Sequence, residues 1–298
     1  MSKIEELFYK IDKETEKLKQ EKNYNYLRAL SEYLELKNDE DYFFIVENYS
    51  KEEIKKVYHF LVLKAFKEMQ DINYNVTPEI ISTYINSIIE SIFSNKKLNV
   101  VDFASGSGNI LLGLNPNSNF TSIDADILYS KLQQNIYNIL QIEANIINQD
   151  VLKPINIDLQ DLIVSDVPYG YYADEDNSLN YKLCSQEGYS LNSLLFIEQT
   201  ANYLKEDGVG ILILPKQIME LPEGLKSFIE KEININAFIL LPEDMFKNKE
   251  QQKVIVLITK KDQKLLPNKI FLAELPSYQN KQGYQLFIED FKNWLNNK

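Results

Sequence analysis

Cysteine and histidine are nearly absent from this chain of 298 residues, which contains only Cys184 and His59. One cysteine excludes a disulfide within the chain, and one histidine excludes most zinc sites and the usual triads of nucleophile and base. His59 lies in a helical pattern, where a lone histidine is more often structural than catalytic, and we assign it no role. Any chemistry must therefore depend on carboxylates, backbone groups and aromatic side chains.

Long apolar runs are also missing, since no stretch approaches the roughly 18 to 20 residues that a bilayer span requires. The first residues, MSKIEE, lack the apolar core of a signal peptide. We therefore expect a cytoplasmic protein with no membrane partner and no metal. The hydrophobic share of 44% and the charged share of 26% are typical of a globular chain, long enough for a full α/β domain and a smaller appendage.

Basic residues are fewer than acidic ones: the chain has 32 Lys and Arg residues and 44 Asp and Glu residues, which gives a net charge of -12. Arg28 is the only arginine, although arginine is the usual reader of guanine in the major groove. A protein that neutralises many phosphates normally carries an excess of basic residues. The composition therefore predicts weak binding to duplex DNA by this chain alone, and a protein partner is compatible with it.

The order of patterns along the chain predicts three regions. Residues 1–75 show apolar side chains at helical spacing, so we expect an all-α N-terminal domain there. Residues 76–263 begin with a helix that Thr77 can cap, and they then alternate short β-rich runs with helical patterns. This alternation is typical of a parallel sheet with helices on both faces. Residues 264–298 form a short tail, with a strand-like run at 270–273 and a helix-like pattern at 286–295, that we expect to pack on this core.

Seven β-rich runs fit one doubly wound, Rossmann-like α/β sheet. We place the strands at residues 98–103, 120–124, 144–147, 162–166, 208–214, 237–241 and 253–259. Helices are expected between them, including residues 128–140, 191–204 and 225–232.

A glycine-containing loop follows the first expected strand, with the sequence DFASGSG at residues 102–108. Two glycines just past a strand let the backbone turn sharply and approach a ligand closely at the start of a helix. A dinucleotide site normally has a third glycine three residues later, where this chain has Leu111. The loop therefore favours a nucleotide-type ligand other than NAD. Its candidate cofactor-binding residues are Asp102, Ala104, Ser105, Gly106 and Gly108.

Acidic residues follow the next two strands and are suited to the rest of such a ligand. Asp124 ends the second strand, where a carboxylate can accept hydrogen bonds from both hydroxyls of a ribose. Asp126 competes for this role, but its position just before a helix suits a cap better. Asp150 follows the third strand, where an adenine amino group could be bound. Because ligands of an open α/β sheet bind at the carboxyl ends of its strands, we expect Asp102, Asp124 and Asp150 at one edge.

The fourth strand ends in the segment Asp166-Val167-Pro168-Tyr169. An amino nitrogen conjugated to a ring or a carbonyl is a weak nucleophile because its lone pair is delocalised. The Asp166 carboxylate and the Val167 carbonyl could accept its two hydrogens and offset the positive charge that develops on nitrogen. Tyr169 could stack on a planar acceptor. These four residues are our candidate catalytic residues, although the segment alone also fits a structural Asp-x-Pro turn.

Taken in order, these motifs resemble those of the amino-methylating, N6-adenine type of class I S-adenosylmethionine-dependent methyltransferases. The resemblance covers roughly residues 70–260 and rests on Thr77-Pro78-Glu79, residues 102–109, Ile123-Asp124, Gln149-Asp150 and residues 165–169. The chain is most similar to the small N6-adenine DNA methylase-like proteins of Gram-positive bacteria, which share residues 166–172, 195–199, 241–246 and the aromatic helix around Trp294. The resemblance implies a seven-stranded methyltransferase fold, S-adenosyl-L-methionine as cofactor and a place for Thr77 near its methionine end.

Two departures from the family pattern bear on the substrate. Val167 replaces the first proline of the family's Asn/Asp-Pro-Pro-aromatic motif, which keeps the carbonyl but loses the rigidity. The segment after Lys264 is short for a target recognition domain. The resemblance therefore implies an N-methyltransferase acting on an amino nitrogen of DNA or RNA, or of a glutamine-like protein side chain. A catalytically silent scaffold that binds the cofactor is the alternative.

Overall fold

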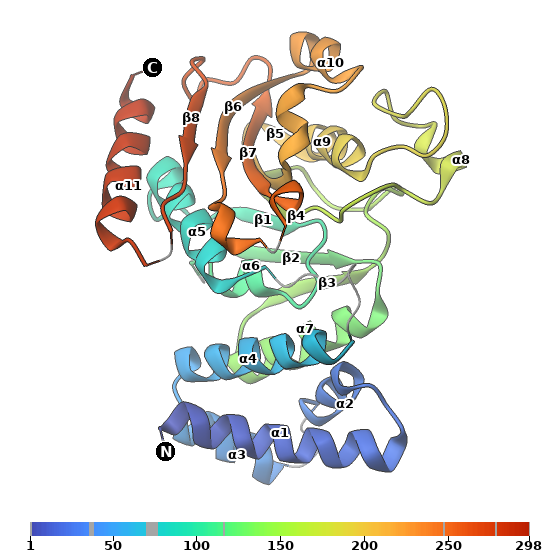
Figure 1. Ribbon diagram of the computed structural model, residues 1–298, viewed down its shortest axis with the longest axis vertical. Helices are drawn as coiled ribbons and strands as arrows, with labels where there is room; N and C mark the ends of the chain where they lie inside the picture. Colours follow the sequence, from blue (N-terminus) through green and yellow to red (C-terminus); the bar gives the residue numbers. More distant parts are fainter. Residues whose placement is uncertain are drawn as a thin grey trace.

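The computed structural model describes residues 2–35, 39–69, 77–115, 117–246, 248–277 and 279–297. Figure 1 shows a central sheet with helices packed against it and a further layer of helices beyond β3. The boundary expected between the N-terminal region and the α/β region, at residues 75 and 76, lies outside the described residues.

In the part of the chain that the structure describes, one sheet of eight strands forms the centre, in the order β3-β2-β1-β4-β5-β7-β6-β8. Strands β1 to β5 pair in parallel, whereas β7 runs antiparallel to both β5 and β6. All seven strands predicted from the sequence are present. The strands are β1 (Asn99–Asp102), β2 (Asn119–Asp124), β3 (Ala144–Asn148), β4 (Gln160–Asp166), β5 (Leu204–Pro215), β6 (Ile233–Leu240), β7 (Lys253–Lys260) and β8 (Phe271–Glu274).

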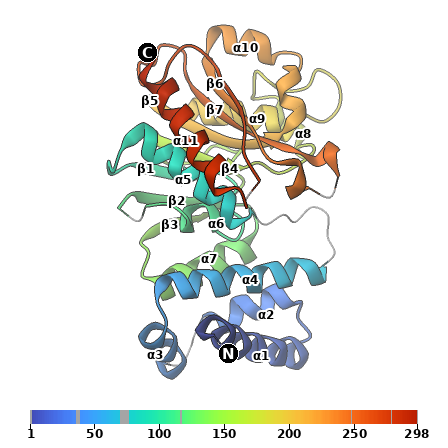
Figure 2. The ribbon, with the colours of Figure 1, turned by 60° about the vertical axis from the view of Figure 1, so that its left-hand side comes forward.

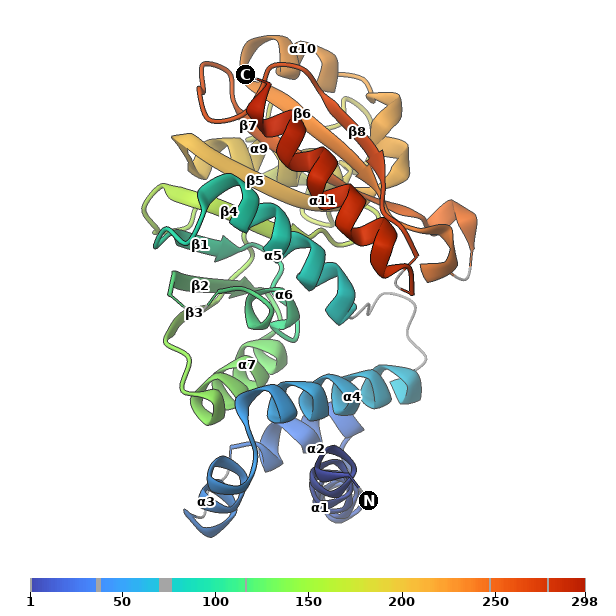
Figure 3. The same cartoon turned by 90° about the vertical axis from the view of Figure 1, so that its left-hand side faces the viewer.

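The eighth strand, β8, comes from the region predicted to be a short tail. It pairs in parallel with β6, with Ala237 opposite Phe271. The prediction of seven strands in the sheet was therefore one strand short. Without β8, the outer edge of β6 would present a row of unpaired backbone groups, and the added strand satisfies them. The chain then returns as α11 (Lys281–Asn296), which packs beside α5 (Glu79–Phe93) (Figure 3).

Helices on the two faces of the sheet divide the buried side chains into two cores. Val100 and Leu162 project into one core, and Val101 and Ile163 project into the other. Adjacent residues enter different cores because successive side chains of a strand point to opposite faces. The first face is covered by α5, α6 (Asn109–Leu112), α7 (Ile127–Leu140) and α11, and the second by α9 (Asn192–Tyr203) and α10 (Leu225–Lys231). The short helical turns are α8 (Glu175–Ser178), η1 (Lys216–Glu220), η2 (Glu243–Met245) and η3 (Lys249–Gln251).

Four N-terminal helices in the described residues form the outer layer; the second, third and fourth contact α7, and the first packs on the second and the fourth (Figures 1 and 2). Asn135 of α7 donates a hydrogen bond to the backbone oxygen of Ser31 at 2.7 Å, and Phe66 stacks on Tyr129 of α7. No helix in the described ranges has the length and apolar character needed to cross a membrane. The four helices are α1 (Lys3–Lys22), α2 (Tyr26–Tyr33), α3 (Asp39–Asn48) and α4 (Lys51–Met69).

The starts of α7 and α5 test two predicted helix caps. Asp126 accepts the backbone N–H of Leu128 at 2.8 Å and caps α7, as predicted. The cap predicted at Thr77 is wrong. Pro78 is the N-cap residue of α5 and makes no side-chain cap, while the Thr77 hydroxyl donates to Asp166 instead. The Thr77 hydroxyl therefore bonds to a residue distant in the sequence, and not to the backbone of the helix as the local sequence predicted.

Candidate active site

The strand ends bring three of the predicted acidic residues to one edge of the sheet. Asp102 ends β1, Asp124 ends β2 and Asp166 ends β4. These three strands are adjacent and parallel, so their carboxyl ends lie side by side. The charges of Asp124 and Asp166 both act to raise the pKa of Asp102, so Asp102 is within electrostatic reach of each of them.

The loop after β1 depends on its two glycines for different reasons. Gly106 and Gly108 have φ values of +51° and +83°, in the left-handed region that favours glycine. A side chain at Gly108 would come within 2.7 Å of the Tyr137 hydroxyl, whereas one at Gly106 would meet no atom of the described residues within 4 Å. Gly108 therefore permits close packing on α7, and Gly106 leaves open space in front of the loop.

Side chains from α4 and α7 hold this loop through three successive carbonyl oxygens. Sequence reasoning missed all three donors, because nothing local indicates which helix face meets the loop. Fixing these carbonyls fixes the orientation of the peptide groups that surround the open side of Gly106. The pairs are Gln133 with the oxygen of Gly106 at 2.5 Å, Tyr58 with the oxygen of Ser107 at 2.6 Å and Tyr137 with the oxygen of Gly108 at 3.3 Å.

Ala104 and Ser105 are held by the ends of β1 and β2. The Ala104 N–H donates to Oδ1 of Asp102 at 3.2 Å, and the Ser105 N–H donates to the oxygen of Ile123 at 3.1 Å. Asp102 is completely buried, and its Oδ2 atom has no hydrogen-bond partner within the described part of the chain. Burial raises the pKa of Asp102 well above its usual range, although the Ala104 N–H acts in the opposite direction. Burial therefore favours the protonated form of Asp102 more than water would.

Asp124 links the loop to the start of α7 through both of its carboxylate oxygens. Oδ2 accepts the N–H of Gly106 at 2.7 Å, and Oδ1 accepts the N–H of Asp126 at 2.8 Å. Burial raises the pKa of Asp124, while these two N–H groups lower it. Each carboxylate oxygen has a second lone pair, so the group can still accept hydrogen bonds from a ligand.

Asp150 lies just beyond β3 and is tied to the segment that follows β4. Its Oδ2 accepts the Tyr172 hydroxyl at 2.6 Å, and its Oδ1 accepts the N–H of Leu152 at 2.9 Å. Asn177 donates to the same tyrosine oxygen at 3.0 Å. Burial and the neighbouring Asp150 raise the pKa of Tyr172, which remains a neutral donor. Sequence reasoning found Asp150 but missed Tyr172.

Asp166 is held by two side chains from distant parts of the chain. Its Oδ2 accepts the Thr77 hydroxyl at 2.9 Å, and its Oδ1 lies 2.6 Å from the ammonium of Lys253. Lys253 is the first residue of β7, and because β7 is antiparallel to β5, this residue lies at the carboxyl edge of the parallel strands. Only 9% of Lys253 is exposed. Sequence reasoning missed Lys253, because a lysine at the start of an apolar strand has the same local pattern as an exposed lysine at a strand end.

Of the three residues after Asp166, the first is buried and the other two are exposed. Val167 is buried, and its N–H donates to the oxygen of Ile213 at 3.1 Å. Pro168 is exposed, and 53% of Tyr169 is exposed. Val167 is therefore fixed by the sheet despite lacking the rigidity of proline, and the Tyr169 ring is accessible to a planar group.

A cleft of about 450 Å³ opens between α4 and α5, next to the start of α6. His59, Glu79 and Asn109 are among the residues that line it. Burial lowers the pKa of His59, although Glu79 and a hydrogen bond with Asn109 act in the opposite direction. Asn109 also donates to the backbone oxygen of Thr77 at 3.4 Å, so the cleft adjoins the residues around Asp166.

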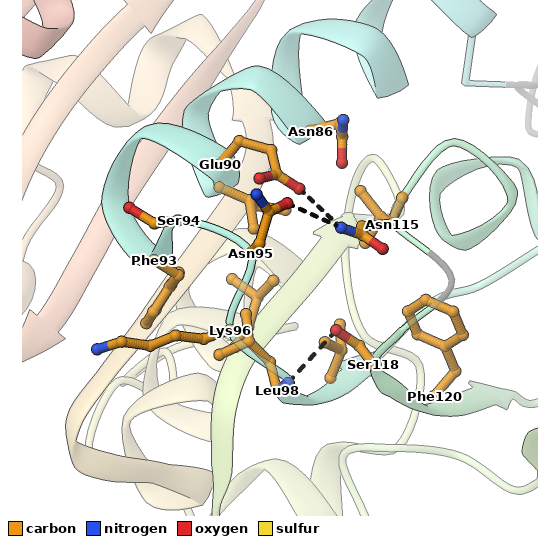
Figure 4. Close-up of a pocket in the computed structure, with 14 residues that line it drawn as sticks. Asn86, Glu90, Phe93, Ser94, Asn95, Lys96, Leu98, Asn115, Ser118 and Phe120 are labelled. Atoms are coloured by element: carbon orange, nitrogen blue, oxygen red, sulfur yellow. Dashed lines mark hydrogen bonds between the residues drawn. The ribbon is translucent and has the colours of Figure 1, made fainter.

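A second hollow lies near the amino end of β1, away from the acidic edge (Figure 4). Asn115 donates there to Glu90 at 3.1 Å and to Asn95 at 3.4 Å. Its volume of about 20 Å³ is enough for a water molecule and far too small for a nucleotide. Within the described residues, no three His, Cys, Asp or Glu side chains gather as metal ligands would.

The β1 loop, Asp124 and Asp166 all lie within a region that matches the model of a protein family. The family model described as N-6 DNA Methylase matches residues 49–293. The chain belongs to the N-6 DNA methylase family. It is thus an N6-adenine methylase-like, S-adenosylmethionine-dependent methyltransferase, and the resemblance drawn from its sequence motifs is confirmed. The match includes α4, so Tyr58 lies inside the family region.

Two relatives resemble this methyltransferase along most of its length. The Bacillus subtilis (strain 168) protein YtxK, itself uncharacterised, is 28% identical over 256 residues, which cover 83% of this chain and 78% of that protein. A Listeria monocytogenes protein with a crystal structure is assigned to the class I S-adenosylmethionine-dependent methyltransferases. It is 27% identical, with a TM-score of 0.87 and coverage of 98% of both chains.

A more distant structure shares only the fold. It is the modification subunit attributed to a type I restriction enzyme of Vibrio vulnificus YJ016, which is 13% identical with a TM-score of 0.65. The similar region covers 82% of this chain and 59% of that subunit.

Proposed function

We propose that this methyltransferase transfers a methyl group from S-adenosyl-L-methionine to an exocyclic amino nitrogen, with adenine as the type of acceptor. The observation that carries the proposal is the 2.9 Å hydrogen bond between Thr77 and Asp166. It joins the start of α5 to the end of β4, next to the loop that contains Gly106. A carboxylate that can accept an amine hydrogen therefore lies beside a nucleotide-type pocket.

The residues at this edge fit S-adenosyl-L-methionine. The open side of Gly106 admits a ligand close to the backbone, and Asp124 retains lone pairs for the two ribose hydroxyls. Asp150 would accept the adenine amino group, and Thr77 would lie toward the methionine end. When bound, this cofactor supplies a methyl group attached to a positively charged sulfur. The residues that would shape the pocket around it are Asp102, Ala104, Ser105 and Gly108.

Asp166 and Val167 would act on the acceptor. Accepting one amine hydrogen at the carboxylate and the other at the Val167 carbonyl moves the nitrogen toward tetrahedral geometry and exposes its lone pair. The proton released on methylation then passes to the carboxylate or to water. Pro168 is exposed just beyond β4, and the exposed Tyr169 would stack on the acceptor ring.

The charge of the chain bears on how the acceptor arrives. A net charge of -12 opposes tight binding of duplex DNA. We infer that adenine reaches the site unpaired, in a nucleic acid delivered by a protein partner or in structured RNA. A carboxamide side chain of a protein has the same conjugated amine and is the second class of acceptor.

Two measurements test this function. Calorimetry should show saturable binding of S-adenosylmethionine or S-adenosylhomocysteine and no binding of NAD. Incubation of a cell extract with the protein and tritiated S-adenosylmethionine should then label an acceptor, which nuclease and protease digestion would assign to nucleic acid or protein. Binding of NAD alone would contradict the proposal, and cofactor binding without any labelling would support the silent scaffold.

A further inference from the structure

The ammonium of Lys253 is the feature of this edge that the proposed function leaves unused. It lies 2.6 Å from Oδ1 of Asp166, the carboxylate proposed to receive the amine. The next five residues of β7, Val254 to Ile258, are apolar and completely buried. A single charged residue therefore stands at the one end of this strand that reaches the acidic edge.

Stability alone gives little reason for this buried pair. Removing two charges from water costs several kcal/mol per ion, and a well-packed apolar pair is often as stable. Lys205 and Asp161 form a comparable pair at the opposite edge of the same sheet, with an N–O distance of 2.8 Å, but their side chains are 41% and 28% exposed. The side chains of Lys253 and Asp166 are 11% and 12% exposed. The buried pair lies where the acceptor is proposed to bind.

The hydrogen-bonding capacity of the pair is only partly used. A lysine ammonium has three donors, and within the described residues Lys253 spends one of them, on Asp166. A carboxylate has about four acceptor sites, of which Thr77 and Lys253 occupy two. The pair can therefore present an acceptor and a donor side by side.

This pattern is complementary to one kind of methyl acceptor. An amine conjugated to a ring or a carbonyl has a hydrogen-bond acceptor atom beside it: N1 or N7 in adenine, and the carbonyl oxygen in a carboxamide. An aliphatic amine or an alcohol lacks that second atom. We propose that Lys253 donates to this neighbouring acceptor atom while Asp166 receives the amine hydrogen, so that the two side chains together select a conjugated amino group. The proposal rests on the proposed function and names the residue that determines its specificity.

The experiment compares purine probes on the full-length protein saturated with S-adenosylhomocysteine. The probes are 9-methyladenine and its 1-deaza and 7-deaza analogues, which each replace one ring nitrogen by carbon, and binding is followed by NMR titration. We expect wild type to bind 9-methyladenine about tenfold more tightly than one of the two analogues, the usual effect of a hydrogen bond from a charged donor. In Lys253→Met this preference should disappear, and Lys253→Arg should retain part of it.

Lys205→Met is the matched control, because it removes a lysine from the pair at the other edge and should leave the preference unchanged. Thermal unfolding of each variant separates folding from recognition, since a purely structural lysine would not change the ratio between two analogues. Equal binding of all three probes by wild type, no binding of any, or a preference that survives in Lys253→Met would overturn the role of Lys253. Cofactor binding in the same samples reports separately on the proposed function.

Discussion

The hydroxyl of Tyr58, in the N-terminal layer of helices, donates a 2.6 Å hydrogen bond to the carbonyl oxygen of Ser107, in the loop after β1. The two residues are 49 positions apart, and Tyr58 is almost completely buried. A helix outside the sheet thus contributes to the shape of the proposed cofactor pocket. The N-terminal region is connected to the site as well as packed beside it.

Tyr58→Phe should weaken S-adenosylhomocysteine binding by about 0.5 to 1.5 kcal/mol, the usual net value of one hydrogen bond. The ring remains in the core, so only the restraint on the Ser107 carbonyl is lost. Calorimetry measures the effect. Tyr26→Phe removes a hydroxyl that donates to Asp12 within the N-terminal layer, and it should leave the affinity unchanged. Equal losses in both variants would mean that Tyr58 acts only through stability.

Asp124→Ala should weaken cofactor binding by about 1 to 3 kcal/mol, because it removes the proposed charge-assisted acceptor of the ribose hydroxyls and the anchor of the Gly106 N–H. Asp126→Ala provides the comparison. It removes the cap of α7 and should cost about 1 kcal/mol of folding free energy, with a smaller effect on the cofactor. If the two variants exchanged these effects, Asp126 would be the ribose ligand.

Asp166→Ala should leave cofactor affinity nearly unchanged and lower methyl transfer by roughly 10²- to 10³-fold, the typical cost of losing one group that stabilises developing charge. The reason is that Asp166 is proposed to contact the acceptor and not the cofactor. Transfer is measured with the acceptor found by tritium labelling. Tyr169→Ala should raise the apparent KM for that acceptor, because it removes the ring that is proposed to stack on the acceptor. Full activity of Asp166→Ala would place the catalytic centre elsewhere.

Asp102→Asn should stabilise the protein at neutral pH and have little effect near pH 4. Burial holds the pKa of Asp102 well above its ordinary value of 3.8, so between these two pKa values the unfolded chain ionises while the folded chain resists ionisation. Wild type therefore loses stability as the pH rises through this window, and asparagine does not. Urea unfolding at a series of pH values gives the difference in free energy, which should grow with pH. A difference that stays constant would show that Asp102 does not titrate in this way.

Duplex DNA should bind weakly or undetectably at physiological salt, because the net charge is -12 and one arginine is present. Fluorescence anisotropy with a labelled duplex at several salt concentrations measures this directly. A tight complex whose affinity falls steeply with salt would show that lysines gather on one face strongly enough to overcome the overall charge.

The elements of the sheet could be predicted from the sequence because each carries its own local signal. Apolar runs such as residues 162–164 and 254–258 are bounded by polar residues and lie among helical patterns, which indicates both the type and the order of the elements. The place of Asp102, Asp124 and Asp166 at one edge then follows from parallel pairing alone, since each residue ends its strand. The sequence pattern indicated a strand near residues 271–274, but it did not indicate which strand of the sheet this segment pairs with. Any unpaired edge strand could have formed that pair.

The partners of the site residues were decided only by the tertiary structure. Thr77 has the sequence of a helix cap, yet its hydroxyl donates to Asp166, 89 positions away. Lys253 reaches the same carboxylate because β7 runs antiparallel to β5, which puts its first residue at the carboxyl edge of its neighbours. Tyr58 meets Ser107 only because α4 packs on α7. Local periodicity specifies which face of an element is buried, whereas strand direction and helix packing decide which distant side chain it meets.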